Sequence, residues 1–211
     1  MGAGVDKLWL EVAGRPVIAH TWQRFNAAAC VDEIILVVRD GMQPHFVELA
    51  EKYHFQKPFR LVVGGAERQD SVWNGLEALS PKTEIVAIQD AARPCTSEDL
   101  IAATIQAARE TGAAVAAQPV TDTIKETADG KVISRTVDRS QLWSVQTPQT
   151  FKVELLAKAY DFIGKKKLGV TDEASAVEAL GEAVHLVPAP LSNIKITTPE
   201  DLALAGTILG V

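Results

Sequence analysis

Two kinds of apolar spacing alternate along the first half of the chain. Short runs rich in Val, Ile and Leu predict buried strands, whereas apolar residues three and four positions apart predict amphipathic helices. The predicted strands cover 33–38, 60–63, 84–88 and 113–117, and the predicted helices cover 43–54, 68–79 and 97–111. Such alternation is typical of an α/β fold in which helices cover both faces of a parallel sheet.

The alternation stops after residue 117. Residues 122–125 and 131–137 flank an Asp-Gly turn and predict a two-stranded hairpin, which we expect to project from the body as an arm. A two-stranded arm is marginally stable alone, so it contacts a second subunit or folds back on its own domain. The remaining predicted elements are helices at 152–163 and 172–180, strands at 183–187 and 193–196, and a helix from 199. We predict a single domain, 1–211, with the arm at 122–137.

Charge and cysteine content narrow the possible functions. The chain has 21 Lys and Arg against 27 Asp and Glu, a net charge of −6, which argues against a general nucleic-acid or membrane-surface binder. No apolar run reaches transmembrane length, and the first residues lack the apolar core of a signal peptide. Two cysteines, Cys30 and Cys95, suit a reducing compartment, so we predict a cytoplasmic protein with no membrane partner.

The strongest candidate for chemistry follows the predicted strand 84–88. Ligands of open α/β sheets bind at the carboxyl ends of the strands. Asp90 stands at that point and could hold a hydrated divalent metal or a ribose hydroxyl, and Arg93 could reach a phosphate. The alternative is an ordinary aspartate in a turn that ends at Pro94.

Two further segments each allow two interpretations. Gly64 and Gly65 follow a strand and would let a ligand approach the backbone, but Asp70 or Ser71 nearby could simply be a helix N-cap. Lys195 lies inside the predicted strand 193–196, where an ammonium group needs a partner such as a phosphate. The alternative is a lysine that protects a sheet edge from aggregation.

Six segments, taken in order, resemble one enzyme family. They are Lys7 with the following GRPV, GGAERQDSV at 64–72, DAARP at 90–94, TVDR with the later TPQ, TDEAS at 171–175, and NIKITTPEDL at 193–202. Together they are similar to the 2-C-methyl-D-erythritol 4-phosphate cytidylyltransferases of the non-mevalonate isoprenoid pathway. The ribitol 5-phosphate cytidylyltransferases share much of this pattern and are the alternative.

The resemblance implies a fold, a reaction and an assembly. The fold would be a three-layer, mostly parallel, Rossmann-like nucleotidyltransferase sheet. The enzyme would join CTP to a polyol phosphate with magnesium and release pyrophosphate. An oxygen of the substrate phosphate would attack the α-phosphorus of CTP in line, without a covalent enzyme intermediate. The arm would cross to the second subunit of a homodimer and complete its pocket.

The resemblance also implies roles for individual residues. The catalytic residues would be Lys7, Arg139 and Lys195. The CTP contacts would be Gly65, Ala66, Ser71, Asp90 and Ala91, with Asp90 also the magnesium ligand. The contacts to the polyol phosphate would be Arg93, Thr123, Arg139, Thr147, Thr171 and Lys195.

The chain departs from the family pattern at its start. The family begins with a buried strand and a glycine-rich loop of the form LAAGxGxRM, and Met1 here matches the Met of that loop, with Gly2 to Gly4 as its tail. We expect two sheet edges to lack a pairing partner, and a version with the upstream strand and loop to turn over CTP faster. A catalytically impaired binding protein is a further alternative. A nucleotide-binding oxidoreductase is disfavoured because no G-x-G-x-x-G follows a predicted strand.

Overall fold

The computed structural model describes residues 6–210, so Met1 and Gly2 to Gly4 lie outside the described residues. The body contains strands β3 (Ile34–Val38), β4 (Phe59–Val63), β5 (Ile85–Ile88), β6 (Ala113–Pro119), β9 (Trp143–Lys152) and β10 (His185–Pro188). Its helices are α1 (Val17–Ala27), α2 (Gln43–Tyr53), α3 (Arg68–Glu77), α4 (Glu98–Thr111), α5 (Val153–Lys166), α6 (Glu173–Ala179) and α7 (Pro199–Leu209). Near the start lie a short 3-10 helix, Lys7–Trp9, and two short paired strands, β1 (Glu11–Val12) and β2 (Arg15–Pro16).

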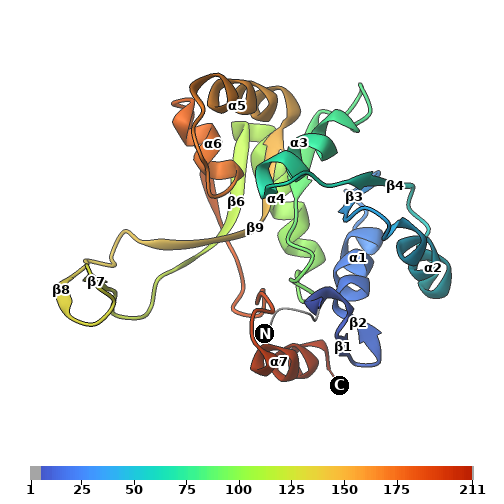
Figure 1. Ribbon diagram of the computed structural model, residues 1–211, viewed down its shortest axis with the longest axis horizontal. Coiled ribbons are helices and arrows are strands. Elements are labelled where there is room, and N and C mark those ends of the chain that lie inside the picture. The colour runs from blue at the N-terminus through green and yellow to red at the C-terminus, as the bar shows by residue number, and fades with distance from the viewer. Residues whose placement is uncertain (1–5, 211) are drawn as a thin grey trace.

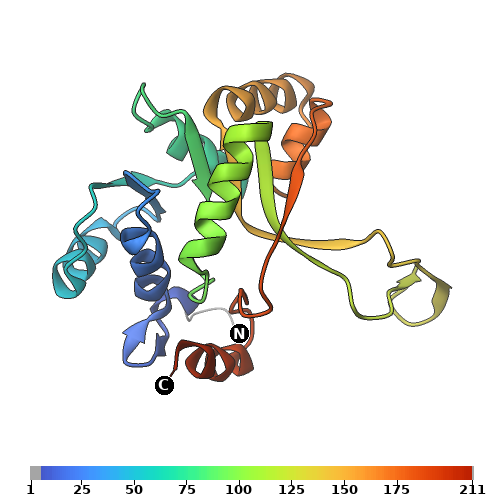
Figure 2. The same ribbon diagram turned by 180° about the vertical axis from the view of Figure 1, so that it is seen from behind.

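The body is a layered α/β structure (Figures 1 and 2). Four strands form a sheet in the order β10-β6-β9-β5, and β3 pairs with β4 in a separate ladder. Helices α5 and α6 pack on one face around Phe151 and Leu156, and α4 packs on the other face through Ile101 and Ile105. The predicted fold class is confirmed. The sheet is nevertheless mixed, because β9 runs antiparallel to β5 and β6 while β6 and β10 are parallel.

Helix ends follow the capping chemistry that the sequence offers. The Ser97 hydroxyl accepts a hydrogen bond from the Leu100 backbone N–H and starts α4 as predicted. Thr198 caps α7 in a reciprocal capping box with Asp201. At α3 the alternative of Asp70 or Ser71 as N-cap is wrong: Glu67 is the N-cap, and Asp70 accepts from the Glu67 N–H as the third helical residue.

The arm is an antiparallel hairpin of β7 (Lys125–Thr127) and β8 (Ile133–Thr136). It stands away from the body in both views rather than lying against it (Figures 1 and 2). Two large apolar side chains near its tip, Val132 and Ile133, are 68% and 61% exposed. Apolar surface of this kind on a protruding hairpin is typical of a contact with another chain.

Several elements differ from the sequence-based expectation: the short strands β1 and β2 were not predicted, and the first strand of the arm is Lys125–Thr127 rather than 122–125. Residues 193–196 form an irregular segment rather than a strand, because the Asn193 N–H bonds back to the Pro190 carbonyl in a turn. Helix α1 was not predicted, although Val17, Trp22 and Phe25 form a buried face along it. Strand β9 was not predicted either, because its buried centre is polar.

A groove separates β3 from β5. Strand β5 ends the four-stranded sheet, and among residues 6–210 β3 pairs only with β4. A cavity of about 770 Å³ lies between them, and its lining includes all residues of β3 and β5 together with Leu8 and Trp22. The Trp22 indole N–H is buried there without a partner among the described residues. Two sheet edges therefore face one largely apolar groove, and neither edge has a ladder partner on that side among residues 6–210.

An apolar strand added ahead of Met1 should fill this groove and pair with both edges. One kcal/mol shifts the Tm of a domain of this size by about 2–4 °C. Several new ladder bonds and buried side chains should therefore raise the Tm by roughly 10 °C. Melting curves of the two chains test this, with a Gly-Ser extension of equal length as control; equal Tm values for all three would contradict the expectation.

Candidate active site

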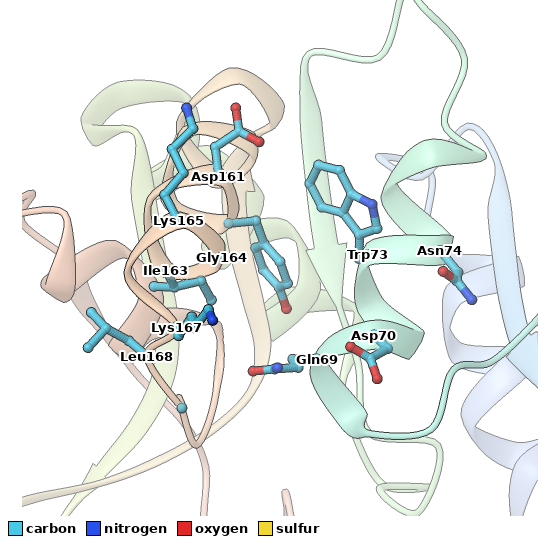
Figure 3. Close-up of a pocket in the computed structure, with 12 residues that line it drawn as sticks. Gln69, Asp70, Trp73, Asn74, Asp161, Ile163, Gly164, Lys165, Lys167 and Leu168 are labelled. Atoms are coloured by element: carbon cyan, nitrogen blue, oxygen red, sulfur yellow. The ribbon is translucent and has the colours of Figure 1, made fainter.

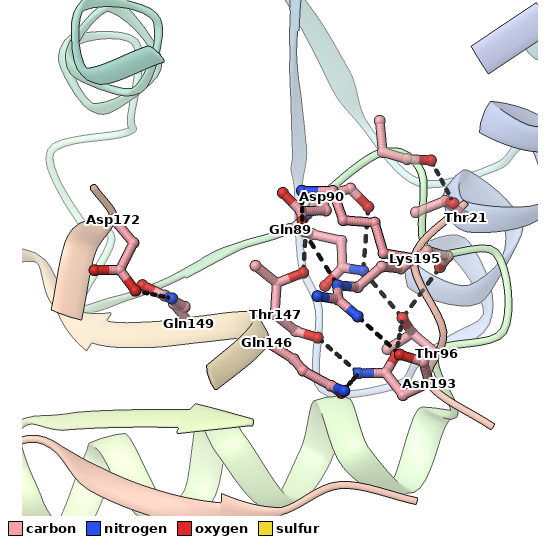
Figure 4. A network of polar contacts seen from close by, with 12 residues as sticks. Thr21, Gln89, Asp90, Thr96, Gln146, Thr147, Gln149, Asp172, Asn193 and Lys195 are labelled. Atoms are coloured by element: carbon pink, nitrogen blue, oxygen red, sulfur yellow. Dashed lines mark hydrogen bonds and ion pairs between the residues drawn. The ribbon is translucent and has the colours of Figure 1, made fainter. Parts of the chain in front are cut away.

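Asp90 lies between two cations at the carboxyl end of β5 (Figure 4). Its Oδ2 atom is 3.2 Å from Nε of Arg93 and 3.0 Å from Nζ of Lys195. The Arg93 side chain is 9% exposed and that of Lys195 is 39% exposed. The carboxylate of Asp90 is thus the partner that the Lys195 ammonium was expected to need, and the interpretation of Lys195 as protection for an edge strand is wrong because no strand forms there.

The two cations control the charge of Asp90. Burial raises the pKa of a carboxyl group, but the hydrogen bond from Lys195 and the charges of Lys195 and Arg93 outweigh this effect and lower the pKa of Asp90. Burial lowers the pKa of Arg93, and Asp90 opposes that shift. Two cations and one carboxylate leave an excess positive charge at the end of β5, which suits an anionic ligand such as a phosphate.

Thr147 lies directly against this cluster. Its Oγ1 atom accepts a hydrogen bond of 3.0 Å from the backbone N–H of Asp90, and the residue is 3% exposed. Two residues further along β9, the Gln149 amide donates to Asp172 at 2.8 Å and accepts from the Ala174 N–H at 3.0 Å. Strand β9 therefore connects the Asp90 cluster with the start of α6, where Thr171 precedes the N-cap.

The glycine loop after β4 packs tightly on α3. The Ser71 hydroxyl accepts a hydrogen bond from the Gly65 N–H and donates to the Glu67 carbonyl, each at 3.1 Å. A Cβ atom on Gly65 would lie 2.2 Å from Cβ of Asp70, and one on Gly64 would lie 2.9 Å from Oγ of Ser71. Gly65 therefore requires glycine because its backbone packs against that of Asp70, whereas a side chain at Gly64 would have to displace the Ser71 hydroxyl, and Ala66 in the same loop is exposed.

The other predicted site residues lie outside this contact network. Lys7 is in the short 3-10 helix that Asp6 caps. Thr123 and Arg139 lie at the base of the arm, where the Arg139 guanidinium donates to the Thr121 carbonyl. No hydrogen bond or ion pair among residues 6–210 joins Lys7, Thr123, Arg139 or Thr171 to Asp90.

Several buried polar residues of the site were missed by the sequence analysis. Asn193 and Thr96 are fully buried, and their side chains bond to one another at 2.8 Å. The Gln89 amide donates to the Thr96 hydroxyl at 3.0 Å. An isolated Asn ahead of an apolar segment was the one available signal, because buried polar side chains need hydrogen-bond partners.

A second cavity, of about 810 Å³, lies between α3 and α5 (Figure 3). Trp73 from α3 stacks on Tyr160 from α5 at 5.8 Å between ring centroids, and the Tyr160 hydroxyl donates to the buried Glu173. Arg68 makes two hydrogen bonds to the same carboxylate. This cluster joins α3, α5 and α6, and none of its residues is among the predicted site residues.

Solved structures define the class of protein. The chain matches the crystal structure of 4-diphosphocytidyl-2C-methyl-D-erythritol synthase from Anaerococcus prevotii DSM 20548 with a TM-score of 0.88 and 34% identity, over 97% of this chain and 93% of that one. It matches 2-C-methyl-D-erythritol 4-phosphate cytidylyltransferase from Thermus thermophilus with a TM-score of 0.83 and 36% identity, over 99% and 96% of the two chains. The protein is a cytidylyltransferase, an enzyme class that transfers a nucleotidyl group.

Sequence comparison gives the family. The family model for IspD, 2-C-methyl-D-erythritol 4-phosphate cytidylyltransferase, matches residues 1–211. The cytidylyltransferase of that name from Alkaliphilus oremlandii is 45% identical over an alignment of 211 positions, which covers 99% of this chain and 89% of that protein. The chain belongs to the 2-C-methyl-D-erythritol 4-phosphate cytidylyltransferase family, which confirms the resemblance found in the sequence. Within residues 6–210, none of the helices is both long and apolar enough to cross a membrane.

Replacement of Asp90 by Asn should destabilise the protein at neutral pH. Arg93 would lose its carboxylate partner while staying buried, and breaking a buried pair in this way costs about 3 kcal/mol. Because the folded pKa of Asp90 is lowered, its contribution is present above the ordinary carboxyl value of about 4 and is lost as the pH falls through the folded pKa.

Urea unfolding of both proteins at pH 7, 5 and 3.5 measures this effect. The difference in unfolding free energy between the wild type and Asp90→Asn should be at its maximum at pH 7 and pH 5. It should begin to decrease at pH 3.5. A difference that stays constant over this range, or no difference at pH 7, would show that the Asp90 pairs contribute little to folding.

Proposed function

We propose that this chain transfers CMP from CTP to 2-C-methyl-D-erythritol 4-phosphate, giving 4-diphosphocytidyl-2-C-methyl-D-erythritol and pyrophosphate. The observation that carries the proposal is the Asp90 cluster, with its excess positive charge, at the carboxyl end of β5 in a member of this family. A phosphate oxygen of the polyol attacks the α-phosphorus of CTP. The bond from that phosphorus to the bridging oxygen of the β-phosphate breaks, and pyrophosphate leaves.

Charge neutralisation and positioning are the main demands of this reaction, because two polyanions must meet in line. In the proposal Lys195 and Arg139 bind the polyol phosphate, and Lys7 stabilises charge at the reacting phosphate. Thr123, Thr147 and Thr171 contact the hydroxyl groups of the polyol. Arg93 donates from Nε to Asp90 and from Nη1 to the Asn193 carbonyl, which leaves its Nη2 group for the polyol phosphate.

The nucleotide would lie along the loops after β4 and β5. Gly65, Ala66 and Ser71 read the cytosine ring, and Asp90 and Ala91 lie beside the ribose. The tight packing of Gly65 on α3 supports this assignment, because it holds the loop backbone in one place. The Ala91 carbonyl accepts a 2.7 Å hydrogen bond from the Thr21 hydroxyl, which fixes the second loop.

Magnesium would bind through Asp90. No group of three or more His, Cys, Asp or Glu side chains among residues 6–210 could hold a metal ion by itself. Magnesium at nucleotide sites commonly takes one or two carboxylates and completes its shell with waters and substrate phosphates. A single ionised carboxylate fits that mode. Both cationic partners of Asp90 contact Oδ2, so neither of these ion pairs involves Oδ1. When bound, the ion would neutralise charge on the triphosphate.

The protein would form a homodimer through contacts of the arm, and it would be located in the cytoplasm. The exposed Val132 and Ile133 of the arm support a contact with a second copy, and Thr123 at the base of the arm would then reach the partner's pocket. Both cysteines are free thiols in the described residues, which suits a reducing compartment.

The substrate is tested by pyrophosphate release from CTP and magnesium with methylerythritol phosphate or ribitol 5-phosphate. The chain and a version extended by the upstream strand and glycine-rich loop should both prefer methylerythritol phosphate. The extended version should be faster by about a hundredfold or more, because the loop adds preorganised phosphate donors. A much higher kcat/KM for ribitol 5-phosphate would mean that the substrate is wrong.

Two substitutions test the phosphate contacts in the same assay. Arg139→Ala and Lys195→Ala each remove a charged hydrogen bond worth roughly 2 kcal/mol, so each should lower kcat/KM for the polyol about 30-fold. Lys166→Ala, at an exposed position in the last turn of α5, is the matched control and should change little. Near-wild-type kinetics for either site variant would remove that residue from the site.

The dimer is tested by replacing residues 122–137 with a short Gly-Ser turn. The expected result is a monomer in sedimentation, because a two-stranded arm needs a partner surface to be stable. The point variant Ile133→Ser should weaken the dimer without removing the arm. A dimer of unchanged strength in both proteins would place the contact elsewhere.

A further inference from the structure

Asn193 joins three segments that carry proposed site residues (Figure 4). It lies between β10 and α7 and is fully buried. Its Nδ2 group donates to the Thr147 carbonyl at 3.0 Å and to Oε1 of Gln146 at 2.8 Å, both on β9. Its Oδ1 atom accepts from the Thr96 hydroxyl at 2.8 Å, in the loop after β5. One amide group therefore bonds to both neighbouring segments.

The backbone of the same residue supports the Asp90 cluster. The Asn193 carbonyl accepts a 2.8 Å hydrogen bond from Nη1 of Arg93, and Nε of that guanidinium bonds to Asp90. Lys195 follows two residues later, with its ammonium 3.0 Å from Asp90. The Ile196 N–H then donates to the Ala92 carbonyl at 2.8 Å. Asn193 thus fixes the segment that carries Lys195 against the loop that carries Asp90.

Only an amide fulfils this set of contacts. Both Nδ2 hydrogens and one Oδ1 lone pair are used inside the protein. An aliphatic side chain would remove the donor to the Thr147 carbonyl and to Oε1 of Gln146 and would leave the Thr96 hydroxyl, as a donor, only its 3.1 Å contact with the Arg93 carbonyl. An aspartate would place a second oxygen against the Thr147 carbonyl, where a donor is required.

We propose that Asn193 is a positioning residue for cytidylyl transfer. It holds Lys195, Asp90 and Thr147 at the spacing at which they meet the two substrates, and it touches neither substrate itself. This inference rests on the proposed function. It differs from a purely structural role because the loss of Asn193 displaces Lys195 and Thr147 in particular, and both are assigned to the polyol phosphate.

The first test is the kinetics of Asn193→Ala and Asn193→Asp in the full chain. A displacement on the order of 1 Å at a reacting group can cost about a hundredfold in rate. Both variants should lower kcat/KM for methylerythritol phosphate by about 10- to 100-fold, with a larger rise in KM for the polyol than for CTP. Ile163→Ala, a buried change on α5, is the matched control. It should lower the Tm similarly but keep both KM values within about threefold of wild type.

The second test combines Asn193→Ala with Lys195→Ala. If Asn193 acts partly through Lys195, the two losses should not multiply: adding Asn193→Ala to Lys195→Ala should slow the enzyme clearly less than Asn193→Ala slows the wild type. Thr96→Val removes the hydroxyl that Asn193 accepts from and should cause a smaller loss of the same kind, about three- to tenfold. If Asn193→Ala does not fold, the kinetics of Thr96→Val test the positioning role of Asn193 instead.

The outcomes separate the two levels of the proposal. If the wild-type chain transfers CMP to no polyol phosphate, the proposed function is contradicted. If the wild type is active and the Asn193 variants keep kcat/KM within threefold of it, the inference is overturned. It is also overturned if the losses of the two single variants multiply fully in the double variant. If Asn193→Ala does not fold, a Thr96→Val protein with unchanged kinetics would also overturn it.

Discussion

The ion-pair cluster of Asp90, Arg93 and Lys195 is the interaction on which the rest of the site depends. A buried carboxylate is unfavourable alone, and two buried or half-buried cations are unfavourable without it. Here Asp90 is held ionised by its two cationic partners, and the cluster as a whole keeps an excess positive charge. Asp90 and Arg93 are three residues apart, whereas Lys195 is distant in the sequence, so the last loop before α7 must return to the end of β5 for Lys195 to join the pair.

The polar residues around this ion-pair cluster fix the relative positions of the segments that carry it. Thr147 accepts from the Asp90 backbone, and Asn193 bonds to both β9 and the loop after β5. Because buried polar groups are costly when unpaired, few alternative arrangements of these segments satisfy all of them. The groove between β3 and β5 reaches the same cluster, since Asp90 and Ala91 are among its lining residues, and it leaves two sheet edges without ladder partners among residues 6–210.

Much of the fold follows from local sequence, and most of the site geometry does not. The apolar runs of β3 and β5 and the Ser97 cap are local signals, and each predicted its element. Strand β9 was not predicted because its buried Thr147 and Gln149 are polar. Their hydrogen-bond partners, Asp90 and Asp172, lie 57 and 23 positions away in the chain. The expected strand at 193–196 was wrong because the Asn193 N–H bonds back to the Pro190 carbonyl in a turn, while its side chain bonds to β9 and to the loop after β5. Position after a strand was enough to single out Asp90, but no local pattern shows which cations meet it.

The most direct test of this account is the pKa of the Asp90 carboxyl, measured by NMR titration with a labelled aspartate in the wild-type chain and in Lys195→Met. The cluster described above predicts a pKa below the ordinary aspartate value in the wild type and a clear rise when the ammonium of Lys195 is removed. An ordinary pKa near about 3.9 that does not respond to the loss of Lys195 would contradict it, because the two charges would then not share a site.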